Sequence, residues 1–153
     1  MKGFDVLKLA LVATGLAAVF ISGASAAETY NAPNIVENTI PKPLAKDAGN
    51  AENGRKIVIN RKQGNCLACH AISSLDNQPF HGEVGPSLDG VAERYSDAEM
   101  RLIVVDPKQV FDGTIMPAFY KKEGLVRVNK KFKDKTILSA QQIEDVIAFL
   151  KAQ

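Results

Sequence analysis

The chain has 153 residues, of which 46% are hydrophobic and 24% are charged. These values are ordinary for one globular domain, and the length excludes two domains of comfortable size. The formal net charge of +2 is too small to indicate nucleic acid as a partner.

The first 26 residues have the organisation of a secretory signal peptide. Lys2 and Lys8 form a charged region, residues 9–21 are apolar, and residues 24–26 form an A-x-A cleavage site. The apolar run spans about 13 residues, whereas the alternative, a transmembrane helix, needs about 20. We therefore expect residues 1–26 to be cleaved, leaving no membrane anchor and exporting the chain into an oxidising compartment.

Residues 27–47 predict an extended N-terminal arm, because they hold three prolines, several polar residues and no helical period. In the free protein we expect this arm to lack fixed contacts. It nevertheless carries apolar side chains that can pack against the domain or a partner: Ile35, Val36, Ile40 and Leu44.

Residues 48–60 predict the first helix of the domain, with residues 57–59 apolar toward its end. Gly54 interrupts it, and a glycine within a helix costs about 1 kcal/mol relative to alanine. Either another backbone passes close to Gly54, or this glycine is a tolerated defect.

The sequence Cys66-Leu67-Ala68-Cys69-His70 has the C-x-x-C-H spacing of covalent c-type haem attachment. On one helical turn, the side chains of Cys66, Cys69 and His70 leave from nearly the same face. The two thiols can then form thioethers with the haem vinyl groups, while the imidazole of His70 binds the iron. We therefore predict one covalently attached haem c.

Three other interpretations of this motif fit less well. A disulfide between Cys66 and Cys69 suits an exported protein, but it does not require His70. A structural zinc site needs four ligands, and with no second cysteine pair, Cys66, Cys69 and the remaining nitrogen candidate, His81, leave the set short. A thioredoxin-type site needs a preceding strand, whereas residues 61–65 read as a polar turn.

Residues 76–87 read as a loop because glycine, proline and asparagine recur in them. An imidazole that binds a metal through one nitrogen usually donates a hydrogen bond from the other. Pro86 has no N–H, but its carbonyl can accept a hydrogen bond, so we predict that Pro86 orients His70. The alternative is a plain turn.

The iron ligand opposite His70 decides whether the haem carries electrons or has an open site. Met100 lies within a predicted helix, where a methionine usually fills the core. Met116 lies in a loop just before Pro117, which fixes the chain, and is the better-placed ligand. His81 is the alternative ligand and is otherwise expected to be a surface or partner-facing imidazole.

Two further helices begin with capping boxes. One follows Ser96, with Glu99 at its third position, and ends before Pro107. The last follows Ser139, with Gln142 in the corresponding place. It carries one apolar stripe, formed by Ile143, Val146, Ile147 and Leu150. The chain is therefore predicted to be all-α.

Residues 121–135 are rich in lysine, and Leu125, Val126 and Val128 within them predict a short strand or hairpin. The lysines either form a solvated loop or dock an acidic partner by electrostatic steering.

Taken together, residues 48–153 resemble the class I cytochromes c. More narrowly, the chain is similar to the SoxX family, the small monohaem cytochromes of sulfur-oxidation (Sox) complexes. The strings that carry this similarity are Ile40-Pro41-Lys42-Pro43-Leu44, Gly64-Asn65-Cys66-Leu67-Ala68-Cys69-His70, His81-Gly82-Glu83-Val84-Gly85-Pro86-Ser87-Leu88, Thr114-Ile115-Met116-Pro117-Ala118-Phe119 and Ile143-Glu144-Asp145-Val146.

The resemblance implies a class I cytochrome c domain in a periplasmic heterodimer with a larger cytochrome subunit, SoxA, which would hold the sulfur-reacting haem. This L-cysteine S-thiosulfotransferase would join thiosulfate to a cysteine of the carrier SoxYZ. The present chain would pass the electrons through a haem bound by His70 and Met116 to a soluble cytochrome c. It would have no catalytic residue of its own. The alternatives are a free-standing periplasmic electron carrier and a haem enzyme with an open sixth position.

Overall fold

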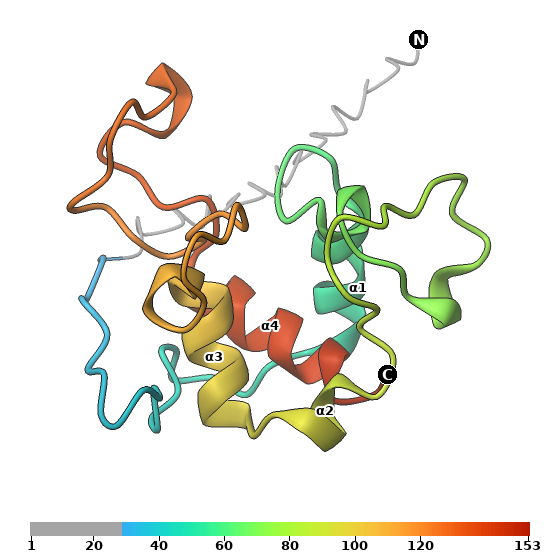
Figure 1. The fold of residues 1–153 in the computed structure, drawn as a ribbon. Coiled ribbons are helices and arrows are strands. Elements are labelled where there is room, and N and C mark those ends of the chain that lie inside the picture. Colours follow the sequence, from blue (N-terminus) through green and yellow to red (C-terminus); the bar gives the residue numbers. More distant parts are fainter. Residues whose placement is uncertain (1–28) are drawn as a thin grey trace, which may run out of the picture.

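Helices α1 (Ala51–Ile59) and α4 (Ala140–Leu150) pack across each other, and α3 (Asp97–Val105) packs against α4 (Figure 1). The computed structural model describes residues 29–153, so the predicted signal peptide, residues 1–26, lies outside the described residues. Helix α2 (Val91–Arg94) is a single turn. The other helical segments are short 3-10 turns: η1 (Cys66–Ala68), η2 (Ser73–Leu75), η3 (Pro107–Gln109) and η4 (Lys130–Phe132).

The regular structure of residues 29–153 is helical, apart from one isolated β-bridge between Val36 and Thr39. The all-α prediction is confirmed. None of the helices in this part of the chain is both long and apolar enough to cross a membrane.

The crossing of α1 and α4 depends on Gly54. A Cβ atom at this position would lie 2.0 Å from the backbone oxygen of Asp145 and 2.8 Å from the Cβ of Phe149. The two helix backbones therefore approach more closely than any larger residue would allow. Of the two interpretations of this glycine, the close approach of another backbone is confirmed.

Both predicted capping boxes are present. The hydroxyl of Ser96 accepts the N–H of Glu99, whose carboxylate accepts the N–H of Ser96 at 2.8 Å. The hydroxyl of Ser139 accepts the N–H of Gln142, whose side-chain oxygen accepts the N–H of Ser139 at 3.0 Å. These bonds satisfy N–H groups that a helix leaves without partners at its start.

The predicted strand at Leu125, Val126 and Val128 is wrong. Gly124 and Arg127 have positive φ angles of 66° and 57°, which interrupt an extended conformation. The apolar side chains are exposed, Val126 by 85%, so no apolar surface covers them as a half-buried strand requires.

The N-terminal arm is fixed to the domain by a buried ion pair, contrary to the expectation that it lacks fixed contacts. Arg101 on α3 binds Glu144 on α4 through two hydrogen bonds of 2.8 and 2.9 Å. Arg101 Nη1 also donates to the carbonyl oxygen of Ile40 at 2.8 Å. Glu144 Oε1 also accepts the N–H of Leu44 at 2.9 Å. The side chain of Ile40 is part of the hydrophobic core and is only 2% exposed.

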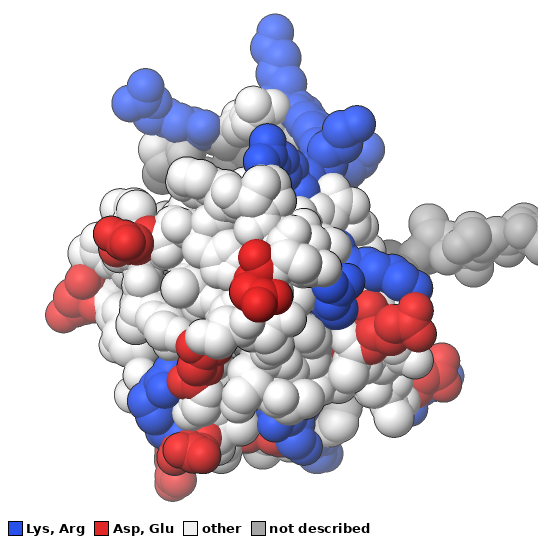
Figure 2. All heavy atoms as spheres, turned by 90° about the vertical axis from the view of Figure 1, so that its right-hand side faces the viewer, with Lys and Arg blue, Asp and Glu red and all other residues white. Residues whose placement is uncertain are grey.

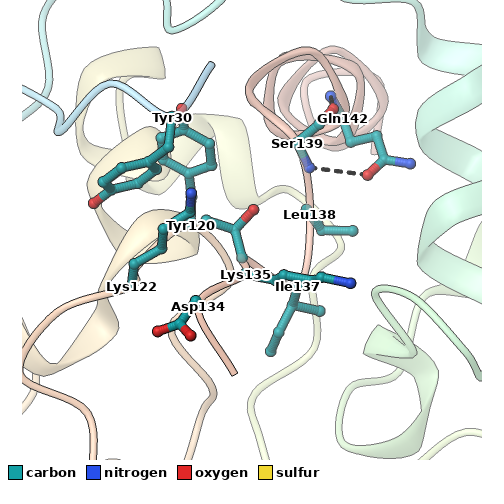
Figure 3. Close-up of a pocket in the computed structure, with 10 residues that line it drawn as sticks. Tyr30, Tyr120, Lys122, Asp134, Lys135, Ile137, Leu138, Ser139 and Gln142 are labelled. Atoms are coloured by element: carbon teal, nitrogen blue, oxygen red, sulfur yellow. Dashed lines mark hydrogen bonds between the residues drawn. The ribbon is translucent and has the colours of Figure 1, made fainter. Parts of the chain in front are cut away.

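The start of the arm rests on an aromatic contact. The ring centres of Tyr30 and Tyr120 lie 5.1 Å apart, and Nζ of Lys122 lies 4.7 Å from the centre of the Tyr30 ring. Figure 3 shows these three side chains across a cavity of about 300 Å³ from Ser139 and Gln142. The described part of the arm, residues 29–47, is thus held near both ends.

Between these anchors the arm makes a tight turn. Val36 and Thr39 exchange two backbone hydrogen bonds of 2.9 Å, and Glu37 and Asn38 between them have positive φ angles. This turn leaves Ile35 and Val36 exposed. The arm therefore offers two apolar side chains on a fixed backbone.

Candidate functional site

The C-x-x-C-H motif forms the tight turn that its spacing predicts. The N–H groups of Cys69 and His70 both donate to the carbonyl oxygen of Cys66, at 3.1 and 3.0 Å. Asn65 enters this turn with a positive φ of 52°, a conformation that asparagine tolerates better than most residues. Leu67 is buried and anchors the turn in the core. One short segment thus carries two thiols and an imidazole.

The two cysteines are free thiols in the structure. Burial raises the pKa of the Cys66 thiol to about 12, so this thiol is protonated at neutral pH. Within residues 29–153, no three His, Cys, Asp or Glu side chains converge to hold a metal ion.

His70 is oriented by the backbone of the facing loop. Its Nδ1 lies 2.7 Å from the carbonyl oxygen of Pro86, which can only accept a hydrogen bond, so that Nδ1 carries the proton. Its Nε2 makes no hydrogen bond within the described residues and is the nitrogen available to a metal. This is the contact predicted for an orienting carbonyl, whereas iron binding by His70 stays a prediction.

Gly85 leaves the space that the imidazole occupies. A Cβ at Gly85 would lie 2.3 Å from Cε1 and 2.6 Å from Nδ1 of His70, closer than any real contact. Gly82 has a similar relation to the turn, since its Cβ would lie 2.1 Å from the carbonyl oxygen of Ala68. The sequence interpretation missed these two contacts, although both glycines stand in the string of residues 81–88 that carries the family resemblance.

Residues 82–89 form a strap that runs along the attachment turn. Three backbone hydrogen bonds of 2.7 to 3.0 Å join the two segments, from Gly82 N to Leu67 O, from Gly85 N to Cys69 O and from Leu88 N to Ala71 O. Asp89 closes the far end of the strap, because its carboxylate accepts the N–H of Ser73 at 2.8 Å. The carbonyl of Pro86 lies between these fixed points.

Met116 lies in a loop after η3 and is partly buried against the core. Its carbonyl oxygen accepts a hydrogen bond from Nζ of Lys108, and its N–H donates to the hydroxyl of Thr114 at 3.2 Å. Met100 is 2% exposed in the core of α3, as expected for a residue that fills space. The backbone of Met116 is therefore held by two hydrogen bonds, and its side chain is only partly buried.

His81 has a structural role and is not a surface or partner-facing imidazole as expected. Its Nδ1 accepts the N–H of Ile72 at 3.3 Å, and its Nε2 lies 3.0 Å from the carbonyl oxygen of Leu75. Because a backbone N–H can only donate, Nδ1 is the acceptor and Nε2 carries the proton. Both ring nitrogens are thus used, and iron binding by His81 would break both hydrogen bonds.

These residues fit a covalent haem in the chemistry of their donors. Two unpaired thiols and an imidazole with Nε2 available lie on one turn, and Gly85 leaves room for the imidazole ring of His70. A separate cavity of about 370 Å³ lies beside this turn, and Leu67, Ala68 and Phe80 are part of its lining.

The comparisons with known proteins agree with this chemistry. The family model described as Cytochrome c matches residues 51–153. Among solved structures, the crystal structure of SoxXA from P. pantotrophus contains a chain that is 42% identical, with a TM-score of 0.74. The match covers 82% of this chain and 97% of that one. A search of curated proteins gave no match.

Proposed function

The chain belongs to the cytochrome c family, within it to the SoxX family, and from this premise we propose that it is the electron-transfer subunit of a periplasmic thiosulfate-oxidising complex. The observation that carries the redox assignment is the orientation of His70 by the carbonyl of Pro86 at 2.7 Å. A hydrogen bond of this kind fixes a metal-binding imidazole and raises its basicity.

Four side chains would hold the cofactor. Cys66 and Cys69 would bind haem c through thioether bonds, His70 would bind the iron through Nε2, and Met116 would supply a second ligand to the iron through its thioether. The bound haem would supply one-electron redox chemistry. The chain itself fixes the ligands: Pro86 holds the ring of His70, and Lys108 holds the backbone of Met116.

The chain would leave the sulfur chemistry to a partner. With both cysteines in thioethers, no free thiol is available to bind a sulfur substrate. The partner would be the larger cytochrome subunit, SoxA, and the carrier SoxYZ would be the substrate of the complex. The electrons would leave through this chain to a soluble cytochrome c.

Two observations favour a subunit over a free-standing periplasmic carrier. The similar chain comes from a structure described as SoxXA, and the similarity covers 97% of that chain. The arm also presents Ile35 and Val36 on a turn fixed at both ends, where a partner can cover them.

Purification of the native protein from periplasmic extract at moderate salt tests the subunit proposal. We expect an equimolar complex with a second, larger cytochrome. A monomer that carries haem would contradict the subunit proposal and favour the free-standing carrier. A protein without covalent haem would contradict the redox function itself.

Carbon monoxide separates electron transfer from the third alternative, a haem enzyme with an open position. The reduced protein is expected to bind carbon monoxide slowly or incompletely, because Met116 would occupy the sixth position. Rapid stoichiometric binding would show an open site.

A further inference from the structure

We propose that Asp89 and Arg94 are positioning residues that hold the carbonyl of Pro86 against His70 and thereby help to set the reduction potential of the haem. This inference rests on the proposed binding of iron by His70. It concerns residues that touch neither the imidazole nor the thiols, and that act through the backbone of residues 82–89.

The carboxylate of Asp89 binds the strap to Ser73, which follows the attachment turn in the sequence. It accepts the N–H of Ser73 at 2.8 Å and the hydroxyl of Ser73 at 2.6 Å. It also accepts the hydroxyl of Ser87 at 3.0 Å. These hydrogen bonds hold the pKa of Asp89 below its ordinary value, so the carboxylate is charged at neutral pH.

Arg94 holds two backbone carbonyls of the strap. Its Nη1 donates to the carbonyl oxygen of Asp89 at 2.7 Å, and its Nη2 donates to that of Ser87 at 2.9 Å. A planar guanidinium can make both bonds at once, whereas a lysine ammonium is a single point of charge. The residue directly after Pro86 is therefore fixed at its carbonyl by Arg94 and at its side chain by Asp89.

Asp89 and Arg94 would affect the haem through one hydrogen bond, between Nδ1 of His70 and the carbonyl of Pro86. Pro86 has no N–H with which to anchor itself, so the position of its carbonyl depends on its neighbours. On one side the N–H of Gly85 donates a hydrogen bond to the carbonyl of Cys69 at 2.7 Å. On the other side the N–H of Leu88 donates to the carbonyl of Ala71 at 3.0 Å, and Asp89 and Arg94 supply the side-chain anchors. If they are lost, the hydrogen bond to Nδ1 of His70 weakens, the imidazole donates less electron density to iron, and the reduced state is favoured.

The test compares holo-proteins carrying Asp89→Asn or Arg94→Lys with the wild type. We expect each variant to keep its covalent haem and its axial ligands but to have a higher reduction potential. Nuclear magnetic resonance of the reduced protein should show faster exchange of the proton on Nδ1 of His70, by about tenfold. Ser73→Ala, which keeps the backbone donor, should shift both quantities less and in the same direction.

Asp97→Asn is the matched control, because Asp97 pairs with Lys151 at 2.8 Å on the half-exposed surface of the same domain. It should leave the potential and the exchange rate unchanged. If the Asp89 and Arg94 variants lower the unfolding midpoint but keep the wild-type potential and exchange rate, their role is merely structural and the proposal is wrong. If the wild type itself lacks a bound imidazole, it is instead the assignment of His70 that fails.

Discussion

Nδ1 of His70 and the carbonyl oxygen of Pro86 lie 2.7 Å apart, across 16 positions of sequence. The contact requires that no side chain stand between the strap and the ring, and Gly85 meets this requirement. Pro86, the next residue, has a backbone carbonyl that accepts a hydrogen bond but no N–H that could donate one. The pair Gly85-Pro86 thus combines the space and the acceptor that an oriented imidazole needs.

Gly85→Ala should damage haem binding directly. The added Cβ would lie 2.3 Å from Cε1 of His70, so the ring or the strap must move. We expect the yield of holo-protein, measured by haem-dependent absorbance per mole of chain, to fall about tenfold or more. The haem that is attached should have an altered potential.

Gly54→Ala provides the contrast to this variant. Its Cβ would also clash, but with the carbonyl of Asp145 at the crossing of α1 and α4. It should lower the thermal unfolding midpoint, while the haem in the folded fraction keeps the wild-type potential. Equal effects of both alanines on the potential would mean that Gly85 acts only through stability.

Met116→Ala should open the sixth position. The variant is expected to bind carbon monoxide rapidly when reduced and to have a lower potential, because thioether ligation favours the ferrous state. Met100→Leu is the control, since it preserves volume in the core and should cost less than about 1.5 kcal/mol without changing the spectrum. An unchanged potential in Met116→Ala would exclude this thioether as the ligand.

The features that were predictable from the sequence are the local ones. The C-x-x-C-H turn and the two capping boxes are set by residues within four positions of each other, so that spacing alone predicts them. The contact of Pro86 with His70 was predictable because it follows from the chemistry of a metal-bound imidazole. For Gly54 the sequence left two interpretations open, a close backbone approach or a tolerated defect. It could not decide between them because the backbone that approaches, at Asp145, is distant in sequence.

The features that were missed depend on three-dimensional partners. Nothing in the arm indicates that Arg101 and Glu144, far along the chain, supply the groups that bind it. His81 looked available because the carbonyl and N–H that use its nitrogens belong to the backbone, which has no sequence signal. The predicted strand failed because apolar residues at 125–128 have no surface against which to pack.

Glu144→Ala should be strongly destabilising and should release the arm. It would leave the guanidinium of Arg101 buried without its counter-charge, which typically costs about 3–5 kcal/mol. Urea unfolding should show this loss, and limited proteolysis should cut residues 29–47 faster than in the wild type. Glu52→Ala, which removes an exposed pair with Lys56, should cost no more than about 0.5 kcal/mol. A small loss in Glu144→Ala would mean that the arm is held by its apolar contacts alone.

Asp106 should contribute a pH dependence to stability. Burial raises the pKa of this carboxyl, but hydrogen bonds from Lys121 and Gln109 outweigh burial, and the net pKa lies below its ordinary value. A depressed folded-state pKa gives stability that is present above the unfolded pKa, about 3.9, and is lost as pH falls through the folded pKa. The difference in unfolding free energy between the wild type and Asp106→Asn should therefore be largest at neutral pH and shrink below about pH 4. A difference that stays constant from pH 7 to pH 3 would contradict the shift.

The lysine-rich segment should influence how fast electrons leave the protein. Basic side chains gather at one end of the molecule, at the top of Figure 2, and η4 lies at the same end in Figure 1. Lys130, Lys131 and Lys133 are exposed there, so a partner of opposite charge can approach them. If they dock an acidic electron acceptor, changing all three to glutamine should slow the second-order transfer rate about tenfold at low ionic strength.

The salt dependence separates this docking from an effect on the haem. The wild-type rate should fall as salt rises and should approach that of the triple variant, because salt screens charges between exposed surfaces. Changing Lys42 and Lys46, which are exposed on the arm, to glutamine should have a smaller effect. Rates that do not depend on ionic strength, with the triple variant equal to the wild type, would identify residues 121–135 as a solvated loop.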